Sequence, residues 1–127
     1  MDRFPGWYLG TEIDAKWWKR YRKNGMFLRG RGEYWFNEQA FYFLRYLTQT
    51  PIVLPFSQLQ GYETGTWHAG RWAWGMQIVK IIWEHQGTLL YSGFVLPHNK
   101  DQLLGLLDTS RKDTDAQKNS FPMKPTT

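Results

Sequence analysis

At 127 residues without a cysteine, the chain fits one domain, and its composition excludes disulfides and thiolate metal sites. Its formal net charge is +5, and aromatic residues make up 18% of it, with eight tryptophans among them. Because its first residues lack the apolar core of a signal peptide, and no uncharged apolar run approaches the ~18 residues of a membrane span, we expect a cytoplasmic protein.

The amino-terminal part of the chain carries a helical pattern after a turn-rich start. Residues 1–10 contain a proline and two glycines, so we expect an irregular lead-in. Thr11 is a candidate N-cap with Asp14 three residues later. Large apolar residues then recur every four positions, at Ile13, Trp17 and Tyr21. We predict a short amphipathic helix over 12–23, with a strand as the alternative because Trp and Tyr also favour strands.

Short strands are expected from residue 31 onward. A strand at 33–36, a turn, and an aromatic strand at 40–47 form a predicted hairpin. A short apolar strand at 52–54 stops at Pro55, which suits a sheet edge because proline cannot donate a ladder hydrogen bond. A further strand is expected at 56–63.

The second half of the chain contains the clearest strand pattern. A loop at 65–70 and a short strand at 72–74 come first. Two apolar strands are then expected at 76–84 and 88–96, joined by a tight His-Gln-Gly turn. This pair forms a second predicted hairpin.

A leucine-rich helix is expected at the carboxyl-terminal end of the domain. Asn99 is a candidate N-cap, and four leucines form one apolar face over 99–107. Gly105 lowers the helix propensity by about 1 kcal/mol relative to alanine, so this helix needs tertiary docking. From residue 109 the sequence is polar and contains prolines, which predicts a disordered tail over 109–127 after a single domain over 11–108.

The order of these elements resembles a known superfold. The segments that carry the resemblance are GEYWF at 32–36, FYF at 41–43, IVLPFSQL at 52–59, IVKIIW at 78–83, FVL at 94–96 and the helix at 99–107. Together they resemble the PH-like superfold, especially its GRAM and bacterial PH-like branches, whereas the 12–23 segment departs from the usual opening strand. The resemblance implies an α+β, mainly β fold: an antiparallel curled sheet or barrel closed by a carboxyl-terminal helix, with Leu103, Leu104 and Leu107 plugging one end.

The resemblance also implies a non-catalytic role, such as binding a lipid headgroup, a peptide or a second copy. The residues themselves offer no catalytic motif and no metal-ligand spacing, because His68, His85 and His98 are scattered along the chain. We therefore predict no enzyme activity, no metal and no cofactor. A small enzyme or ligand-binding protein, with a pocket assembled from distant residues, stays as an alternative.

One segment concentrates the positive charge. Between Asp14 and Glu33 there are seven basic residues and no acidic one, whereas the rest of the chain holds nine basic and eleven acidic residues. The segment predicts a surface for an anionic ligand, with a lipid membrane as the first candidate and nucleic acid as the second. The simplest alternative is a solvated face whose tryptophans pack on the barrel beneath lysine stems. The seven residues are Lys16, Lys19, Arg20, Arg22, Lys23, Arg29 and Arg31.

The aromatic residues exceed what one core face needs. We expect some of them to form an interface for a protein partner or a second copy, because Tyr and Trp are enriched at binding hot spots. The alternative is that the predicted amino-terminal helix covers them. The candidates are Trp17, Trp18, Tyr42, Tyr46, Trp72 and Trp74.

Overall fold

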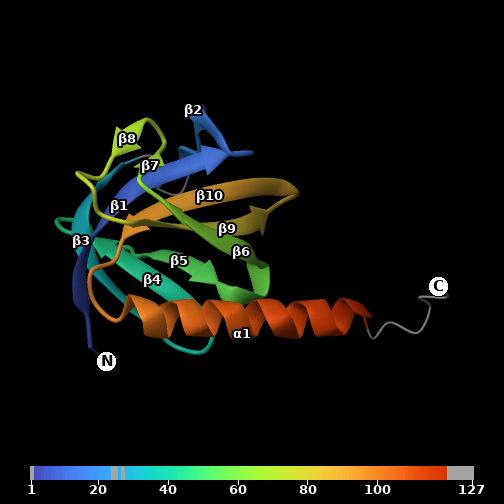
Figure 1. Cartoon of the computed structure of the whole chain (residues 1–127). Coiled ribbons are helices and arrows are strands. Elements are labelled where there is room, and N and C mark those ends of the chain that lie inside the picture. Colours follow the sequence, from blue (N-terminus) through green and yellow to red (C-terminus); the bar gives the residue numbers. More distant parts are fainter. Residues whose placement is uncertain (1, 24–25, 27, 120–127) are drawn as a thin grey trace.

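The computed structural model of the chain describes residues 2–23, 26 and 28–119. Its main sheet has eight antiparallel strands in the order β5-β4-β3-β1-β10-β9-β6, with β2 paired to β1 (Figure 1). A separate two-stranded sheet pairs β7 with β8. The strands are β1 (Phe4–Ile13), β2 (Lys16–Arg20), β3 (Gly30–Phe36), β4 (Ala40–Arg45), β5 (Ile52–Pro55), β6 (Leu59–Gly65), β7 (Trp67–His68), β8 (Arg71–Trp72), β9 (Ile78–His85) and β10 (Thr88–Val95).

The long strand β1 holds the main sheet together because it pairs with three other strands. Its first half runs beside β3, from Phe4 opposite Tyr34 to Tyr8 opposite Gly30, and β10 and β2 flank its second half. A register shift between Tyr8 and Gly10 bends the strand at this point. The sheet curls without closing, and in the described part of the chain no strand joins its two edges, β5 and β6.

The helix α1 (Lys100–Asn119) covers one end of the curled sheet. It packs against β6 and against the 3-10 turn η2 (Phe56–Gln58). Leu103 and Leu107 are fully buried in the core, and Leu104 packs against it from the rim. The predicted antiparallel curled sheet and carboxyl-terminal helix are therefore confirmed.

α1 is longer than the leucine pattern predicts. The helix continues through residues 109–119, which we expected to belong to a disordered tail. The remaining residues of that expected tail, 120–127, lie outside the described part of the chain.

Aromatic side chains fill the interior of the curled sheet. Their rings pack closely, with the Phe41 and Phe94 centroids 4.8 Å apart. The buried tyrosine hydroxyls are satisfied: Tyr8 lies 2.6 Å from the Thr11 hydroxyl, and Tyr34 accepts a hydrogen bond from the His98 N–H at 2.8 Å. Among the residues that the structure describes, the fully buried Phe and Tyr side chains are Tyr8, Tyr34, Phe41, Phe43 and Phe94.

The predicted helix over 12–23 is wrong, because this stretch contains the end of β1 and the strand β2. Asp14 and Ala15 form a two-residue turn in which both φ angles are positive, 55° and 61°, and Ile13 pairs with Lys16 across it. The strand prevails because the end of β1 pairs with β10 on one side and with β2 on the other. A four-residue spacing in the sequence does not reveal this pairing. For the same reason residues 4–10, the expected lead-in, are part of β1.

The remaining strands lie within a few residues of their predicted positions, with two differences between β6 and β9. The expected loop at 65–70 contains β7, and the strand expected at 72–74 begins one residue earlier as β8. In this small sheet Trp67 pairs with Trp72.

Gly32 marks the closest approach between β3 and β4. A Cβ added to Gly32 would lie 2.2 Å from the Leu44 carbonyl oxygen, whereas one added to Gly30 would meet no atom within 4 Å. We expect Gly32→Ala to lower the free energy of unfolding by about 3 kcal/mol because backbone atoms must move apart. Urea unfolding measures the loss, and Gly30→Ala on the same strand is the matched control. Equal stability of the two variants would contradict the observed strand packing.

Candidate interaction surface

Two hairpins project together at one end of the molecule. One is formed by β1 and β2 and the other by β7 and β8, and Figure 1 shows β2 and β8 as neighbours above the main sheet. They meet where the Trp17 ring covers Gly70, since a Cβ added to Gly70 would lie 3.6 Å from that ring. We call this surface the aromatic–basic end, and define it by Lys16, Trp17, Trp18, Lys19, Arg20, Arg22, Lys23, Arg29, Trp67, Arg71, Trp72 and Trp74.

Five of the eight tryptophans lie at this end with at least half of their surface exposed. Trp74 is 80% exposed and Trp18 is 61% exposed. Trp17 and Trp18 contact each other edge to face at 5.8 Å between centroids. Trp72 and Trp74 lie 5.4 Å apart. Clusters of exposed aromatic rings are typical of interaction surfaces, because monomeric proteins otherwise keep apolar patches small.

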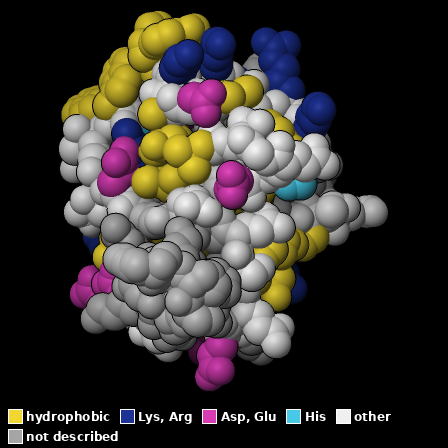
Figure 2. Space-filling view, turned by 90° about the vertical axis from the view of Figure 1, so that its right-hand side faces the viewer, with side chains coloured by type: hydrophobic (Ala, Val, Ile, Leu, Met, Phe, Trp, Pro, Cys, Tyr) yellow, Lys and Arg dark blue, Asp and Glu magenta, His cyan; other side chains and the backbone are white. Residues whose placement is uncertain are grey.

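Basic side chains surround these rings. Figure 2 shows hydrophobic surface beside lysine and arginine side chains at the same end of the molecule. The exposed acidic residue of the β1–β2 turn is Asp14, whereas Glu12 is buried behind the surface. The end therefore presents positive charge and exposed indole rings together.

Buried polar groups fasten the β7–β8 hairpin to β1. The Ala69 N–H donates to the Glu12 carboxylate at 2.7 Å, and His68 Nε2 lies 2.9 Å from the Gly10 carbonyl oxygen. The fully buried His68 ring packs so tightly on Gly93 that a Cβ there would lie 2.3 Å from it. These contacts hold the β7–β8 hairpin, which carries exposed tryptophans, in a fixed position on the main sheet.

The His68 imidazole is neutral in this contact between the β7–β8 hairpin and β1. Burial lowers the pKa of His68 to about 4, and the Glu12 carboxylate opposes the shift only in part. His68 Nδ1 and Glu12 Oε1 are 3.8 Å apart. At neutral pH the contact is therefore between a neutral imidazole and a carboxylate rather than between two charges.

Arg29 also fastens the β7–β8 hairpin to β1, and it adds positive charge there. Its Nε donates to the Leu9 carbonyl at 3.0 Å, and its Nη2 donates to the Ala69 carbonyl. Burial, followed by the charges of Arg20 and Arg71, lowers the pKa of Arg29 to about 10. Three guanidinium groups from separate parts of the chain, those of Arg20, Arg29 and Arg71, therefore gather at the aromatic–basic end.

The structure divides the residues that the sequence singled out. Six of the seven predicted basic residues lie at the aromatic–basic end. The seventh, Arg31, lies on β3 with its guanidinium 5.6 Å from the Trp7 ring centroid. The two tryptophans of this segment, Trp17 and Trp18, are 54% and 61% exposed.

The predicted aromatic interface splits between two surfaces. Trp17, Trp18, Trp72 and Trp74 lie at the aromatic–basic end. Tyr42 instead stacks on Trp35 on the outer face of β3 and β4, at 5.4 Å between centroids and with the rings 7° from parallel. Tyr46 follows β4 and is about half exposed.

Trp67 and Arg71 belong to the aromatic–basic end, and sequence reasoning missed both. They lie in β7 and β8, inside a stretch that the pattern predicts as mostly loop. A signal was present, since three tryptophans fall in the turn-rich stretch between Gly65 and Gly75. Apolar rings in a turn-rich segment without strand periodicity are expected to be exposed.

Catalytic or metal chemistry finds no support in the described residues. Among them no group of three or more His, Asp or Glu side chains could hold a metal ion. His68 holds the β7–β8 hairpin on β1. The ring centroid of His85 lies 5.8 Å from that of Trp83, and the His98 ring stacks on Phe4 at 6.2 Å between centroids. Residues 2–23, 26 and 28–119 also include no helix long and apolar enough to cross a membrane.

One comparison with known proteins identifies a family. A family model described as Bacterial PH domain-like matches residues 1–106. No curated protein matches the chain. The matched range contains every strand and the buried leucine of α1 at position 103, so both hairpins of the aromatic–basic end fall inside the family's domain.

Proposed function

The chain belongs to the bacterial PH domain-like family, whose membership indicates a non-catalytic interaction module, and from this premise we propose that its aromatic–basic end binds anionic membrane surfaces. The proposal is carried by one observation: five exposed tryptophans and a set of basic side chains occupy one end of the domain. The bilayer is approached by the two hairpins, and the curled sheet and α1 stay on the water side.

The chemistry of a bilayer surface matches both parts of this end. Indole rings favour the headgroup level because they combine a large apolar body with a polar N–H. Lysine and arginine side chains are attracted by the negative potential of anionic lipids, and each contributes about 1 kcal/mol close to the surface. Each tryptophan that buries about 100 Å² of apolar surface adds about 2.5 kcal/mol.

The fixed position of the β7–β8 hairpin on β1 supports the same proposal. Glu12, His68 and Arg29 hold the hairpin in place before any contact with a membrane. Binding therefore costs little ordering of the tryptophans, since rigid aromatic groups lose less conformational entropy than a mobile loop.

Co-sedimentation with lipid vesicles tests the function. We expect the chain to sediment with vesicles that contain phosphatidylglycerol and to bind vesicles of pure phosphatidylcholine much more weakly. Raising the salt from about 0.05 M to about 0.5 M is expected to weaken the first interaction by screening the basic side chains. Absence of binding to phosphatidylglycerol vesicles at low salt would remove the proposal, and salt-sensitive binding to single-stranded DNA in its place would favour the nucleic-acid alternative.

A single lysine substitution measures the electrostatic part. Lys19→Gln removes one exposed charge from β2, and we expect about 5-fold weaker binding to phosphatidylglycerol vesicles, which corresponds to about 1 kcal/mol. Lys100→Gln is the matched control, because Lys100 lies on α1 at the other side of the sheet. Equal losses for both variants would show that net charge, not the aromatic–basic end, governs binding.

A further inference from the structure

The backbone of the edge strand β5 is paired on one side only. In an antiparallel sheet, residues that bond to a neighbouring strand alternate with residues that point their N–H and C=O groups away from it. The Phe56 N–H donates to the Gln39 carbonyl at 2.9 Å, one step beyond the last pair in the register of β4 and β5. Counting back from this bond, Pro51, Val53 and Pro55 point their backbone groups away from β4.

This outward edge offers two acceptors and one donor. Proline has no N–H, so Pro51 presents its carbonyl alone, whereas Val53 presents both its N–H and its C=O group. The strand ends at Pro55, which is the N-cap of the 3-10 turn η2. In the part of the chain that the structure describes, no strand pairs with this edge. An unpaired strand edge is a template on which another strand can add.

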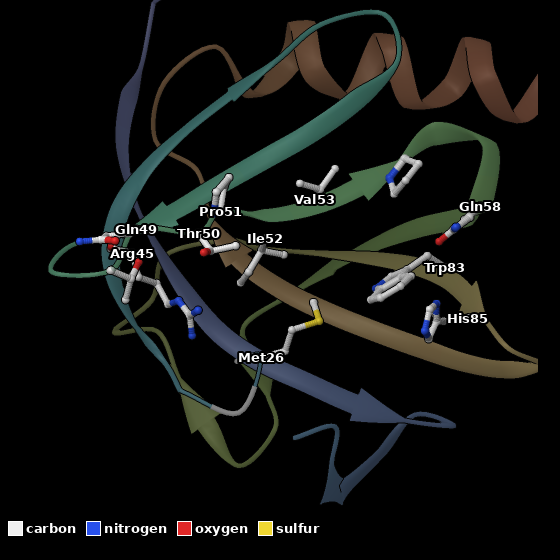
Figure 3. A pocket seen from close by; sticks show the side chains of 12 residues that line it. Met26, Arg45, Gln49, Thr50, Pro51, Ile52, Val53, Gln58, Trp83 and His85 are labelled. Carbon is white, nitrogen blue, oxygen red and sulfur yellow. Dashed lines mark hydrogen bonds between the residues drawn. The ribbon is translucent and has the colours of Figure 1, made fainter. Parts of the chain in front are cut away.

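A cavity of about 630 Å³ lies along the same edge. Pro51, Val53 and Pro55 line one side of it, and Trp83 and His85 at the end of β9 line the other. Figure 3 shows the space between β5 and the end of β9. A volume of this size is in the range of ligand sites, so the edge has room beside it for an added segment of chain.

The inner wall of the cavity is apolar, and its ends are polar. Met26, Ile52 and Trp83 form the inner wall, and each is at most 5% exposed. Gln49 lies before β5 at one end, and Gln58 of η2 lies at the other (Figure 3). Amide side chains both donate and accept hydrogen bonds, so they suit the backbone of a segment that runs past β5. The polar residues of the lining are Arg45, Thr48, Gln49, Thr50, Gln58 and His85.

The count of donors at this edge favours a peptide over a second copy of the chain. If two β5 strands paired antiparallel about Val53, the two valines would exchange two hydrogen bonds. Each Pro51 carbonyl would then face a Pro55 that has no N–H to donate, and burying it unpaired costs stability. A proline-free segment supplies an N–H opposite Pro51 as well, and so makes three hydrogen bonds to one edge.

We propose that the β5 edge binds an extended, proline-free peptide segment of a partner protein, added antiparallel to β5 within the cavity. Side chains directly opposite each other lie on the same face of a sheet. The two peptide residues beside the one opposite Val53 therefore point inward with Ile52, toward Met26 and Trp83, and we expect them to be apolar. None of the described residues that line the cavity belongs to the aromatic–basic end, so this inference is independent of membrane binding.

Calorimetric titration with methylated peptides tests the hydrogen bonds. The probe is acetyl-Thr-Val-Thr-Val-Thr-amide, whose third residue is expected opposite Val53 and whose fifth is expected opposite Pro51. Methylation of the amide nitrogens of the third and fifth residues removes the two donors to β5, and we expect at least about 10-fold weaker binding. The matched control carries its methyl groups on the second and fourth residues, whose N–H groups face away from β5, and should keep most of the affinity. Equal losses for both methylated peptides, or no binding of the parent peptide, would overturn the proposal.

A substitution at Val53 tests the location. Val53→Pro removes the outward donor of β5, and the ladder between β4 and β5 does not use this N–H. We expect it to weaken binding of the parent peptide at least about 10-fold and to leave sedimentation with phosphatidylglycerol vesicles unchanged. Val53→Thr keeps the N–H and nearly the same shape, so it should bind the peptide like the native chain. Urea unfolding measures whether both variants are folded, and equal peptide affinity of the two would contradict the site.

Hydrogen exchange reports directly on the bound edge. We expect the peptide to slow exchange of the Val53 amide at least about 10-fold, while the Leu54 amide, which bonds to β4, exchanges slowly with and without peptide. Unchanged exchange of the Val53 amide in the peptide complex would place the peptide elsewhere and overturn the proposal. Dimerisation of the free chain that Val53→Pro abolishes would assign the edge to a second copy and would overturn it as well.

Discussion

We expect the four-alanine variant, which combines Trp17→Ala, Trp18→Ala, Trp72→Ala and Trp74→Ala, to bind phosphatidylglycerol vesicles at least about 100-fold more weakly than the native chain. This factor corresponds to a loss of about 2.7 kcal/mol of binding free energy. The four indole rings removed are exposed in solution and would transfer apolar surface from water to the bilayer interface. All basic side chains remain in this variant, so the loss measures the aromatic contribution alone. Co-sedimentation at low salt gives the affinity.

Two controls make this result specific. Urea unfolding of the variant measures how far it stays folded, because the Trp17 ring that it removes also covers Gly70. Trp35→Ala removes an indole from the outer face of β3, where the ring stacks on Tyr42, and should leave vesicle binding unchanged. Native affinity of the four-alanine variant would contradict the role assigned to the aromatic–basic end.

The second large effect is a loss of folding stability at acidic pH. Because the pKa of His68 is about 4 in the folded chain and about 6.5 when unfolded, the unfolded state binds the proton more readily. The contribution of His68 to stability is fully present above pH ~6.5 and is lost as the pH falls toward ~4. We expect the free energy of unfolding to fall by about 3 kcal/mol over this window. Urea unfolding at pH ~7.5 and pH ~4.5 measures the loss.

The titration of His68 itself provides the decisive comparison. In the folded chain its ring resonances are expected to stay at their neutral positions between pH ~7 and pH ~5. A titration midpoint of His68 near pH ~6.5 would show that the ring is accessible to water. It would also show that the β7–β8 hairpin contacts β1 differently from the described arrangement. His68→Gln should lose the part of the pH dependence that this group causes.

Most of the fold could be predicted because its strands alternate buried and exposed side chains. In β4, where the sequence predicts an aromatic strand, Phe41 and Phe43 are buried while Tyr42 between them faces outward. The docked leucines of α1 were likewise visible as one apolar face. These features are local, and the structure keeps them.

The β1–β2 hairpin could not be predicted because its determinants are not local. Ile13, Trp17 and Tyr21 fit a helix as well as a strand, and the turn at Asp14 and Ala15 uses positive φ angles without a glycine. Only the pairing of the end of β1 with β10 and β2 decides between the two structures.

The candidate site was half visible for the same reason. The charge of the basic segment can be counted along the sequence, and it led to six residues of the aromatic–basic end. Trp67 and Arg71 join them only because buried contacts of Glu12, His68 and Arg29 bring the β7–β8 hairpin onto β1. Long-range contacts of this kind leave no periodic signal in the sequence.

Quenching of tryptophan fluorescence by brominated lipid chains tests the central claim most directly, because it reports whether indole rings reach the bilayer. On phosphatidylglycerol vesicles with brominated chains, we predict strong quenching of the native chain and weak quenching of the four-alanine variant at a lipid concentration that binds both. Unquenched fluorescence of vesicle-bound native chain would contradict the claim, since the tryptophans of the aromatic–basic end would then face water rather than lipid.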